Sequence, residues 1–229
     1  MKIKFGSLVV AGSGKIGGHV ASKNRGGAYL RTKVTPSNPQ TIRQLTARSI
    51  LSSLSSAWSG LSASQRASWS NAVANFATTD IFGDIRNPSG NNLYVKLNTN
   101  LINSEQSTLT VAPEKLEVPF SGIVSAIGDI SVSTIAVTFE NENLDTIPLL
   151  VFATPSLPQG VNFVKNKLRL LGKFEGDSNG LSNGGELWSA YVAKFGVPAI
   201  GANIVISVKP VIATGQAGLA QTAKLTVQA

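Results

Sequence analysis

The stretch "DISVSTIAVTF", Asp129–Phe139, is the clearest strand signal in the chain. Its apolar side chains nearly alternate with polar ones from Ile130 to Phe139, which is typical of a β-strand with one buried face. The alternation breaks at Ser133 and Thr134, and a β-bulge would explain that break. The stretch therefore predicts that this part of the chain folds as β-sheet.

Beyond residue 110 the chain consists of short runs rich in β-forming residues, and Gly, Pro and Asn separate these runs. About seven such runs predict a C-terminal antiparallel β-sandwich over residues 118–229, similar at the level of fold to immunoglobulin and fibronectin III modules. The polar, Pro-containing segment 106–117 has the composition of a linker. The runs are "SGIVSAIG", "DISVSTIAVTF", "IPLLVFATPS", "FVKNKLRLLGKF", "ELWSAYVAKFG", "NIVISVKPVIATG" and "LAQTAKLTVQ".

Residues 39–105 have the 3.6-residue periodicity of helices and predict a small helical unit. For its first helix, Asn38 suits the N-cap and Pro39 suits the first helical position. The apolar face of this helix consists of Ala47, Ile50, Leu51, Leu54 and Trp58.

Two further helices follow in the same unit. Ser62 and Gln65 form a capping-box pair that predicts the second helix after Gly60. Trp58 and Trp69 could stack on nucleobases, but their helical spacing with other apolar residues favours a place in the core. The apolar positions are Trp69, Ala72, Val73 and Phe76 in the second helix, and Leu93, Leu97 and Leu101 in the third, which begins after "NPSG". The whole chain is therefore predicted to be an α+β multidomain protein.

Positive charge is concentrated in the first third of the chain. Residues 1–79 carry ten Lys and Arg and no acid, because the first acid is Asp80; the rest carries ten bases and twelve acids. Residues 1–38 are rich in glycine and have no helical period, which predicts an extended basic arm with short strand-like pieces. Such an arm suits an anionic partner, such as nucleic acid or an acidic protein surface, or it simply keeps the chain in solution. The predicted partner-binding residues are Lys15, Lys23, Arg25, Tyr29, Arg31, Lys33, Arg43 and Arg48.

The stretch "LVVAGSGKIGGHV", Leu8–Val20, has the G-x-G-x-x-G spacing of a dinucleotide-binding turn. A dinucleotide site also needs a helix after the glycines and an acid about 20 residues further on. More glycines follow instead, and no acid precedes Asp80. Lys15 lies at the wrong spacing for a phosphate loop. We therefore expect no nucleotide cofactor here, and expect glycines that serve tight turns or a close backbone approach.

The sequence predicts no enzyme, cofactor or metal site. It contains no Cys and a single histidine, His19, so thiolate chemistry and His or Cys metal clusters are excluded. Three carboxylate pairs lie in turn-like segments, where backbone hydrogen bonding is their usual role. No apolar run approaches the roughly 18 residues that span a bilayer, and the first residues lack a signal-peptide core, so a soluble chain with no membrane partner is expected. The pairs are Asp80 with Asp84, Glu140 with Glu142, and Glu175 with Asp177.

Residues 12–103 contain an ordered set of motifs. These are G-G-x-V-x-S-x-N-R-x-G at Gly17–Gly27, P-x-N-P-x-T-x-x-Q-x-x-x-R at Pro36–Arg48, W-x-x-L at Trp58–Leu61, and Q-R-x-x-W at Gln65–Trp69. The set resembles a pattern found in uncharacterised proteins of tailed and other bacteriophages and of prophages. The resemblance implies a virion-associated structural role without catalysis, in a protein made in the host cytoplasm and located in the virion.

Two functions remain open from the sequence. The first is a virion structural protein whose residues 1–105 attach it to capsid, connector or tail components, while the sandwich projects outward. Such a protein is expected to be present in many copies or as a homo-oligomer. The second is a nucleic-acid-binding packaging or nucleoid protein that uses the basic arm on phosphates.

Overall fold

The computed structural model describes residues 12–24, 26–118, 122–140, 147–158, 160–161, 163–177, 180–181 and 184–229. The fold is mixed α+β, as predicted. The chain divides into two compact units, which are described separately below. The first unit comprises Met1–Arg48 and Ala77–Arg86, and the second comprises Ser49–Phe76 and Asn87–Ala229.

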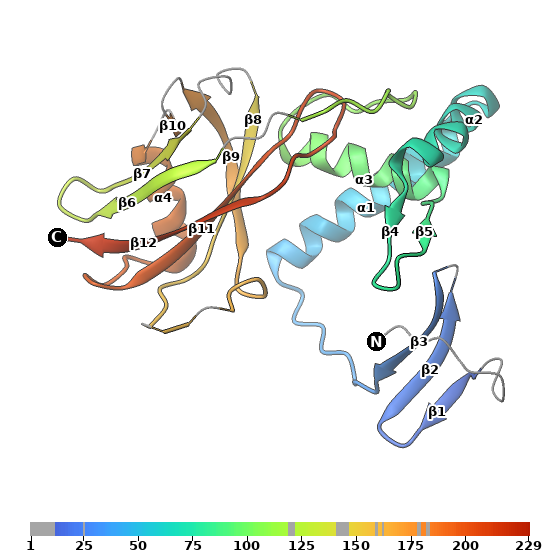
Figure 1. Ribbon diagram of the computed structural model, residues 1–229, viewed down its shortest axis with the longest axis horizontal. Helices are drawn as coiled ribbons and strands as arrows, with labels where there is room; N and C mark the ends of the chain where they lie inside the picture. The colour runs from blue at the N-terminus through green and yellow to red at the C-terminus, as the bar shows by residue number, and fades with distance from the viewer. Residues whose placement is uncertain are drawn as a thin grey trace. The chain divides into compact units, whose positions relative to one another are not determined.

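The first unit contains an antiparallel three-stranded sheet, drawn in blue in Figure 1. Its strands are β1 (Gly14–Ile16), β2 (His19–Asn24) and β3 (Gly27–Thr32). These strands form a sheet, whereas the sequence predicted an extended arm with short strand-like pieces. Gly17 has a φ of +54° in the two-residue turn between β1 and β2. This glycine pattern therefore forms a β-hairpin, as expected of a tight turn and not of a dinucleotide site.

Helix α1 (Ile42–Gly60) begins later than predicted. Gln40 has a φ of +49°, which is incompatible with a helix that continues from Pro39. The cap prediction at Asn38 is wrong: the Thr41 hydroxyl accepts the N–H of Gln44 at 3.4 Å, and Asn38 instead accepts a hydrogen bond from Arg48 at 2.8 Å.

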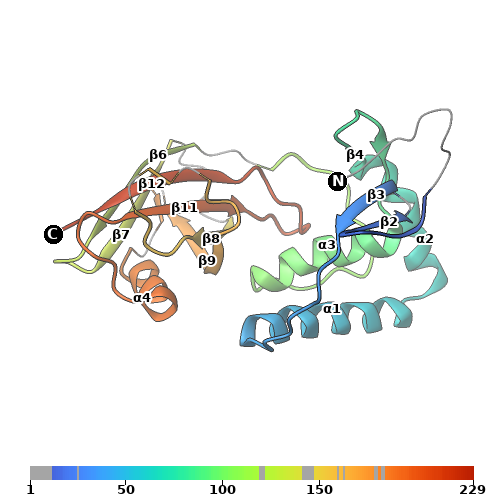
Figure 2. The ribbon, with the colours of Figure 1, turned by 90° about the horizontal axis from the view of Figure 1, so that it is seen from below.

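The helical part of the second unit has its own hydrophobic core. The capping box of Ser62 and Gln65 is confirmed at the start of α2 (Ala63–Ala72), which continues into a short 3₁₀ turn, η1 (Val73–Phe76). Helix α3 (Gly90–Asn103) begins after "NPSG", and Figure 2 shows it alongside α1. The core comprises Leu54, Leu61, Trp69, Leu93, Tyr94 and Leu97, with Ile50, Trp58, Ala72, Val73 and Phe76 packed against it. Of the predicted apolar face of α1, Ala47 and Leu51 remain exposed.

The β-strands of the second unit form a ring. They are β6 (Ile123–Asp129), β7 (Thr134–Phe139), β8 (Pro148–Ala153), β9 (Arg169–Asp177), β10 (Gly180–Leu181), β11 (Asn203–Pro210) and β12 (Gln221–Gln228). Their order is β10-β7-β6-β12-β11-β8-β9, and β10 closes the ring by pairing with both β7 and β9. Every neighbouring pair is antiparallel except β6 and β12, which run parallel.

Two predictions in this region are wrong. The break in "DISVSTIAVTF" is the turn Ile130–Ser133 between β6 and β7, with Ser133 at a φ of +52°, and not a bulge within one strand. The run "ELWSAYVAKFG" lies within helix α4 (Gly184–Phe195). Its Leu187, Trp188 and Tyr191 are buried in the core of the ring, and α4 packs against β7 and β9, the strands that β10 bridges.

The segment 106–118 contains no helix or strand, but its backbone is held at several points. Asn98, which is fully buried on α3, pairs with both backbone groups of Leu109, at 2.7 and 3.2 Å. The indole of Trp69 donates to the carbonyl of Thr110 at 2.9 Å, and Ala112 donates to Ser68 at 3.2 Å. The segment is therefore part of the packed structure of the second unit.

Candidate functional site

The sheet of the first unit carries four of the predicted partner-binding residues, and its register sorts them by face. Lys15, Val20 and Arg31 lie directly opposite one another on β1, β2 and β3, so they share one face. Tyr29, two residues before Arg31 and half-buried, lies on the same face, whereas Lys23 lies on the other.

The remaining predicted residues lie beyond this sheet or outside the described chain. Lys33 follows β3 and is exposed, and its N–H donates to the carbonyl of Gly18 at 2.8 Å. Arg43 and Arg48 are exposed on α1, and Arg48 bonds to Asn38. Arg25 lies outside the described residues. The structure thus brings together Lys15, Tyr29 and Arg31, which we call the basic face.

The opposite face of the sheet, as described, has one buried residue, Ala21, near its centre. Ala21 is 4% exposed, and its neighbours across the strands are Gly14 and the half-buried Leu30. His19 is on this face but exposed at the start of β2, beside Ile16 and Thr32. No acid lies among these neighbours, so nothing here arranges His19 for proton transfer.

A two-stranded hairpin, β4 (Thr78–Thr79) and β5 (Ile85–Arg86), completes the first unit. Asp80 organises its turn: one carboxylate oxygen accepts the N–H groups of Phe82 and Asp84 at 2.8 and 3.1 Å, and the other accepts the guanidinium of Arg86 at 3.3 Å. The role predicted for Asp80 in turn formation is therefore confirmed. The turn presents Ile81 to solvent, and β5 presents Ile85, with 76% and 73% of their surfaces exposed.

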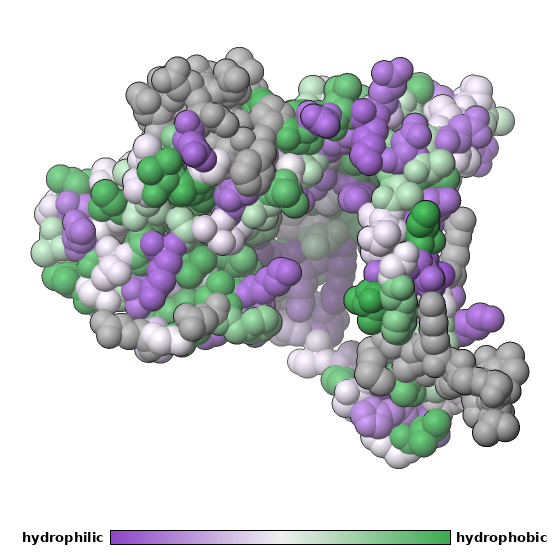
Figure 3. All heavy atoms as spheres, viewed as in Figure 1, coloured by the Kyte–Doolittle hydropathy of each residue, from purple (hydrophilic) through white to green (hydrophobic). Residues whose placement is uncertain are grey.

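The first unit exposes several large apolar side chains and buries few of its described ones. Among the described residues, Ala21 is the only fully buried hydrophobic residue of the first unit. In the part of the chain that the structure describes, seventeen large hydrophobic residues are exposed, and seven of them belong to this unit. Figure 3 shows hydrophobic and hydrophilic side chains side by side on its visible face. The seven are Ile16, Val34, Ile42, Leu45, Ile81, Phe82 and Ile85.

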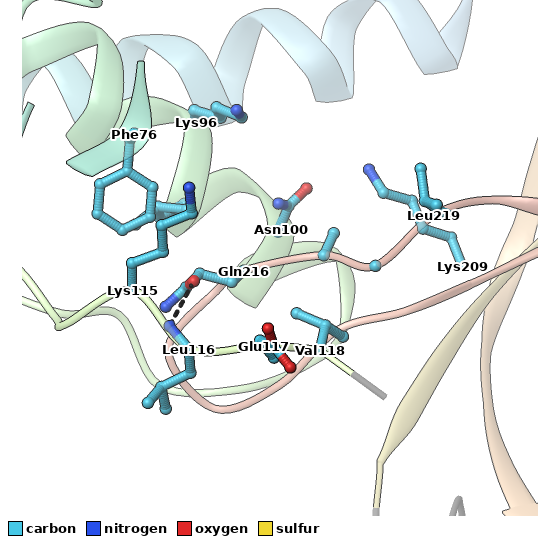
Figure 4. A pocket seen from close by; sticks show the side chains of 13 residues that line it. Phe76, Lys96, Asn100, Lys115, Leu116, Glu117, Val118, Lys209, Gln216 and Leu219 are labelled. Carbon is cyan, nitrogen blue, oxygen red and sulfur yellow. Dashed lines mark hydrogen bonds between the residues drawn. The ribbon is translucent and has the colours of Figure 1, made fainter. Parts of the chain in front are cut away.

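The second unit contains a pocket of about 500 Å³ that the sequence does not reveal (Figure 4). Lys96 reaches it from α3, Lys115 from the segment 106–118, and Lys209 from β11. Glu117 is the only acid among the described residues that line it. The three lysines are far apart in the sequence and share no motif, so no local pattern could identify them.

Hydrogen bonds hold the walls of this pocket in place. The Gln216 side chain accepts the N–H of Leu116 at 3.0 Å, the dashed line in Figure 4, and donates to the carbonyl of Glu114 at 2.6 Å. The Asn100 side chain donates to the carbonyl of Gly215 at 2.8 Å. Segment 106–118, α3 and the loop between β11 and β12 are thereby joined around the pocket.

The surroundings of Lys209 in the pocket disfavour its charged form. Burial lowers the pKa of the Lys209 ammonium, and the positive charge of Lys96 lowers that pKa further. Among the described residues, none of the three ammonium groups forms an ion pair within 4.0 Å. The pocket thus holds positive charge that described carboxylates do not directly compensate.

Within the described part of the chain, no group of three or more His, Asp or Glu residues is placed to hold a metal ion. None of the described helices is both long and apolar enough to cross a membrane. The carboxylate of Glu175 pairs with Lys173 at 3.2 Å, while Glu142 lies outside the described residues. Comparisons with protein-family models, with curated proteins and with solved structures find no match for the chain.

Proposed function

We propose that this chain is a structural protein of a bacteriophage particle, attached to a capsid, connector or tail component through residues 1–105. The observation that carries the proposal is the exposure of apolar side chains on the first unit. Among its described residues, this unit exposes seven large apolar side chains and buries almost none. Clusters of exposed apolar side chains, such as Ile81, Phe82 and Ile85 on one hairpin, mark protein interfaces. The motif order over residues 12–103 supplies the phage assignment.

The basic face and the hairpin tip give the attachment surface two kinds of contact. Lys15 and Arg31 suit carboxylates of an acidic partner, whereas Ile81 and Ile85 suit an apolar recess. Strand β1 also ends the sheet as described, and a partner strand can pair with its edge. The ring of the second unit closes on itself and offers no comparable edge among the described strands.

The part of the second unit beyond residue 118 is the displayed part in this proposal. Its ring of strands acts as the immunoglobulin-like or fibronectin III-like module predicted from the sequence, and it projects from the particle. Its surface is free to contact neighbouring copies or other virion proteins.

Nucleic-acid binding is the competing function, favoured by the exposed Lys15, Lys23, Arg31 and Lys33. Phosphate binding releases counterions, so the affinity for DNA would fall steeply with salt, whereas apolar docking is far less salt-dependent. Apolar side chains such as Ile81 and Ile85 have no role in a phosphate contact.

The test compares two variants of the full chain. The first carries Ile81→Ser and Ile85→Ser, and the second carries Lys15→Gln and Arg31→Gln. Incorporation of each tagged chain into purified parent particles and binding of each to non-specific DNA at two salt concentrations are measured. The proposal expects the serine variant to lose incorporation without a change in DNA binding. Normal incorporation of the serine variant, together with salt-sensitive DNA binding that only the glutamine variant loses, would refute it.

A further inference from the structure

The pocket of the second unit combines two kinds of lining. Lys96, Lys115 and Lys209 supply three cationic groups, and Glu117 supplies one carboxylate. The rest of the lining is mostly apolar and includes Phe76, Leu97, Leu116, Val118 and Leu219 (Figure 4).

We propose that this pocket binds an organic anion, a phosphate or carboxylate joined to an apolar group. The lysines hold the anionic end, and the apolar side chains cover the rest of the ligand. The proposal is independent of the phage assignment, because it rests only on residues of the second unit.

The charge of the pocket favours an anion over a neutral or cationic ligand. Three ammonium groups and one carboxylate leave a net charge of about +2 at neutral pH. Lys209 is half-buried and close enough to Lys96 for the two charges to repel. An anion between them would replace this repulsion with attraction to both charges, through charge-assisted hydrogen bonds.

The size and walls of the pocket favour a ligand larger than an inorganic ion. A volume of about 500 Å³ lies within the range of roughly 300–1,000 Å³ that is usual for small-molecule sites. Phe76 and Leu97 come from the helical core, and Leu219 from the loop before β12, so the apolar surface is assembled from distant segments. A bare phosphate would leave this surface in contact with water.

The pocket is also preformed in its backbone. Gln216 fixes the Leu116 backbone, and Asn100 fixes the Gly215 backbone, so binding does not have to order these segments. Preorganisation of this kind reduces the entropic cost of binding. A bound anion opposes the lowering of the Lys209 pKa, because it stabilises the charged ammonium group.

The test is calorimetric titration of the full chain with phenyl phosphate, benzoate, inorganic phosphate and phenol. The two aryl anions separate a phosphate-bearing ligand from a carboxylate-bearing one, such as a chain terminus of a partner. We expect saturable binding of at least one aryl anion, at least about tenfold tighter than either inorganic phosphate or phenol, since each of these lacks one half of the contacts.

Matched variants assign the binding to the pocket. Lys209→Met and Lys115→Met should each weaken aryl-anion binding by about tenfold or more, because each removes a charged contact. Lys224→Met is the control. Lys224 is exposed on β12, and its substitution changes the total charge of the chain by the same amount as the two pocket substitutions. Lys115 is exposed on a segment without helix or strand, so its variant provides an independent test that does not depend on the half-buried Lys209.

Three results would overturn the proposal. They are no saturable binding of either aryl anion, equal binding of inorganic phosphate and of the aryl anions, and an equal loss of binding in Lys224→Met and Lys115→Met.

Discussion

Trp69 allows the sharpest test of how the helical part of the second unit is held together. Its side chain is fully buried, its ring meets Tyr94 edge-on with 5.3 Å between centroids, and its indole donates to the Thr110 carbonyl. Truncation of a buried Trp to Ala costs about 3–5 kcal/mol. The aromatic contact with Tyr94 adds roughly 0.5–1.5 kcal/mol beyond burial. The Thr110 carbonyl, which would lose its hydrogen bond from the indole, costs about 1–3 kcal/mol more. Because these contributions overlap, we expect Trp69→Ala to lose about 5 kcal/mol.

The assay is urea unfolding together with thermal unfolding, both followed by far-ultraviolet circular dichroism, because the substitution itself changes the fluorescence. For a unit of this size, a loss of about 5 kcal/mol lowers Tm by about 10–20 °C. Trp58 is the comparison: its ring also packs on Tyr94, at 5.4 Å, but it is only half-buried, so Trp58→Ala should cost less. A loss for Trp69→Ala below about 1 kcal/mol, or no larger than that of Trp58→Ala, would refute the core assignment. Unchanged melting with lost nucleic-acid binding would instead support base stacking.

Three further predictions use the same unfolding measurement. Gly215→Ala should destabilise the chain by about 1–3 kcal/mol more than Gly201→Ala. Both glycines have a positive φ, so the backbone strain is similar in the two variants. An added Cβ at Gly215 would lie 2.5 Å from a backbone carbonyl oxygen of α3, whereas an added Cβ at Gly201 has no other atom within 4 Å. Equal losses would contradict that close approach. Asn98→Ala should cost about 1–3 kcal/mol, because it leaves both backbone groups of Leu109 without their partner, and a loss near zero would show that water replaces the amide. Lys209→Met should stabilise the chain at neutral pH, because the lysine that it removes has a lower pKa in the folded state than in the unfolded state. The gain in stability should shrink as pH rises from the lowered folded pKa towards the ordinary lysine pKa. A gain that grows with pH would show that the pKa of Lys209 is shifted in the opposite direction.

Local signals in the sequence predicted much of the helical unit. Ser62 and Gln65 lie three residues apart and cap α2 as expected, and Leu93, Leu97 and Leu101 are all buried on α3. These features depend on residues within one or two helical turns of each other, so the sequence displays them directly.

Features that depend on distant contacts were harder to predict. The run containing Trp188 and Tyr191 has residues typical of strands, yet Leu187 and Tyr191 have the i, i+4 spacing of α4 and fill the core of the ring. Tertiary burial thus outweighed local propensity. The pocket lysines lie on α3, on segment 106–118 and on β11, so only the folded chain brings them to one place.

The parallel pairing of β6 with β12 has a consequence for the order of folding. Gly128 and Val227 are partners across roughly a hundred residues of chain, whereas the β6–β7 and β11–β12 hairpins join near neighbours. Contacts between residues so far apart in the sequence form slowly. We therefore expect the helices and hairpins to form first and the pairing of β6 with β12 to form last. Until then both strands expose unpaired edges to other copies of the chain. The yield of native protein should therefore depend on temperature and chain concentration during synthesis more than on the stability of the finished fold.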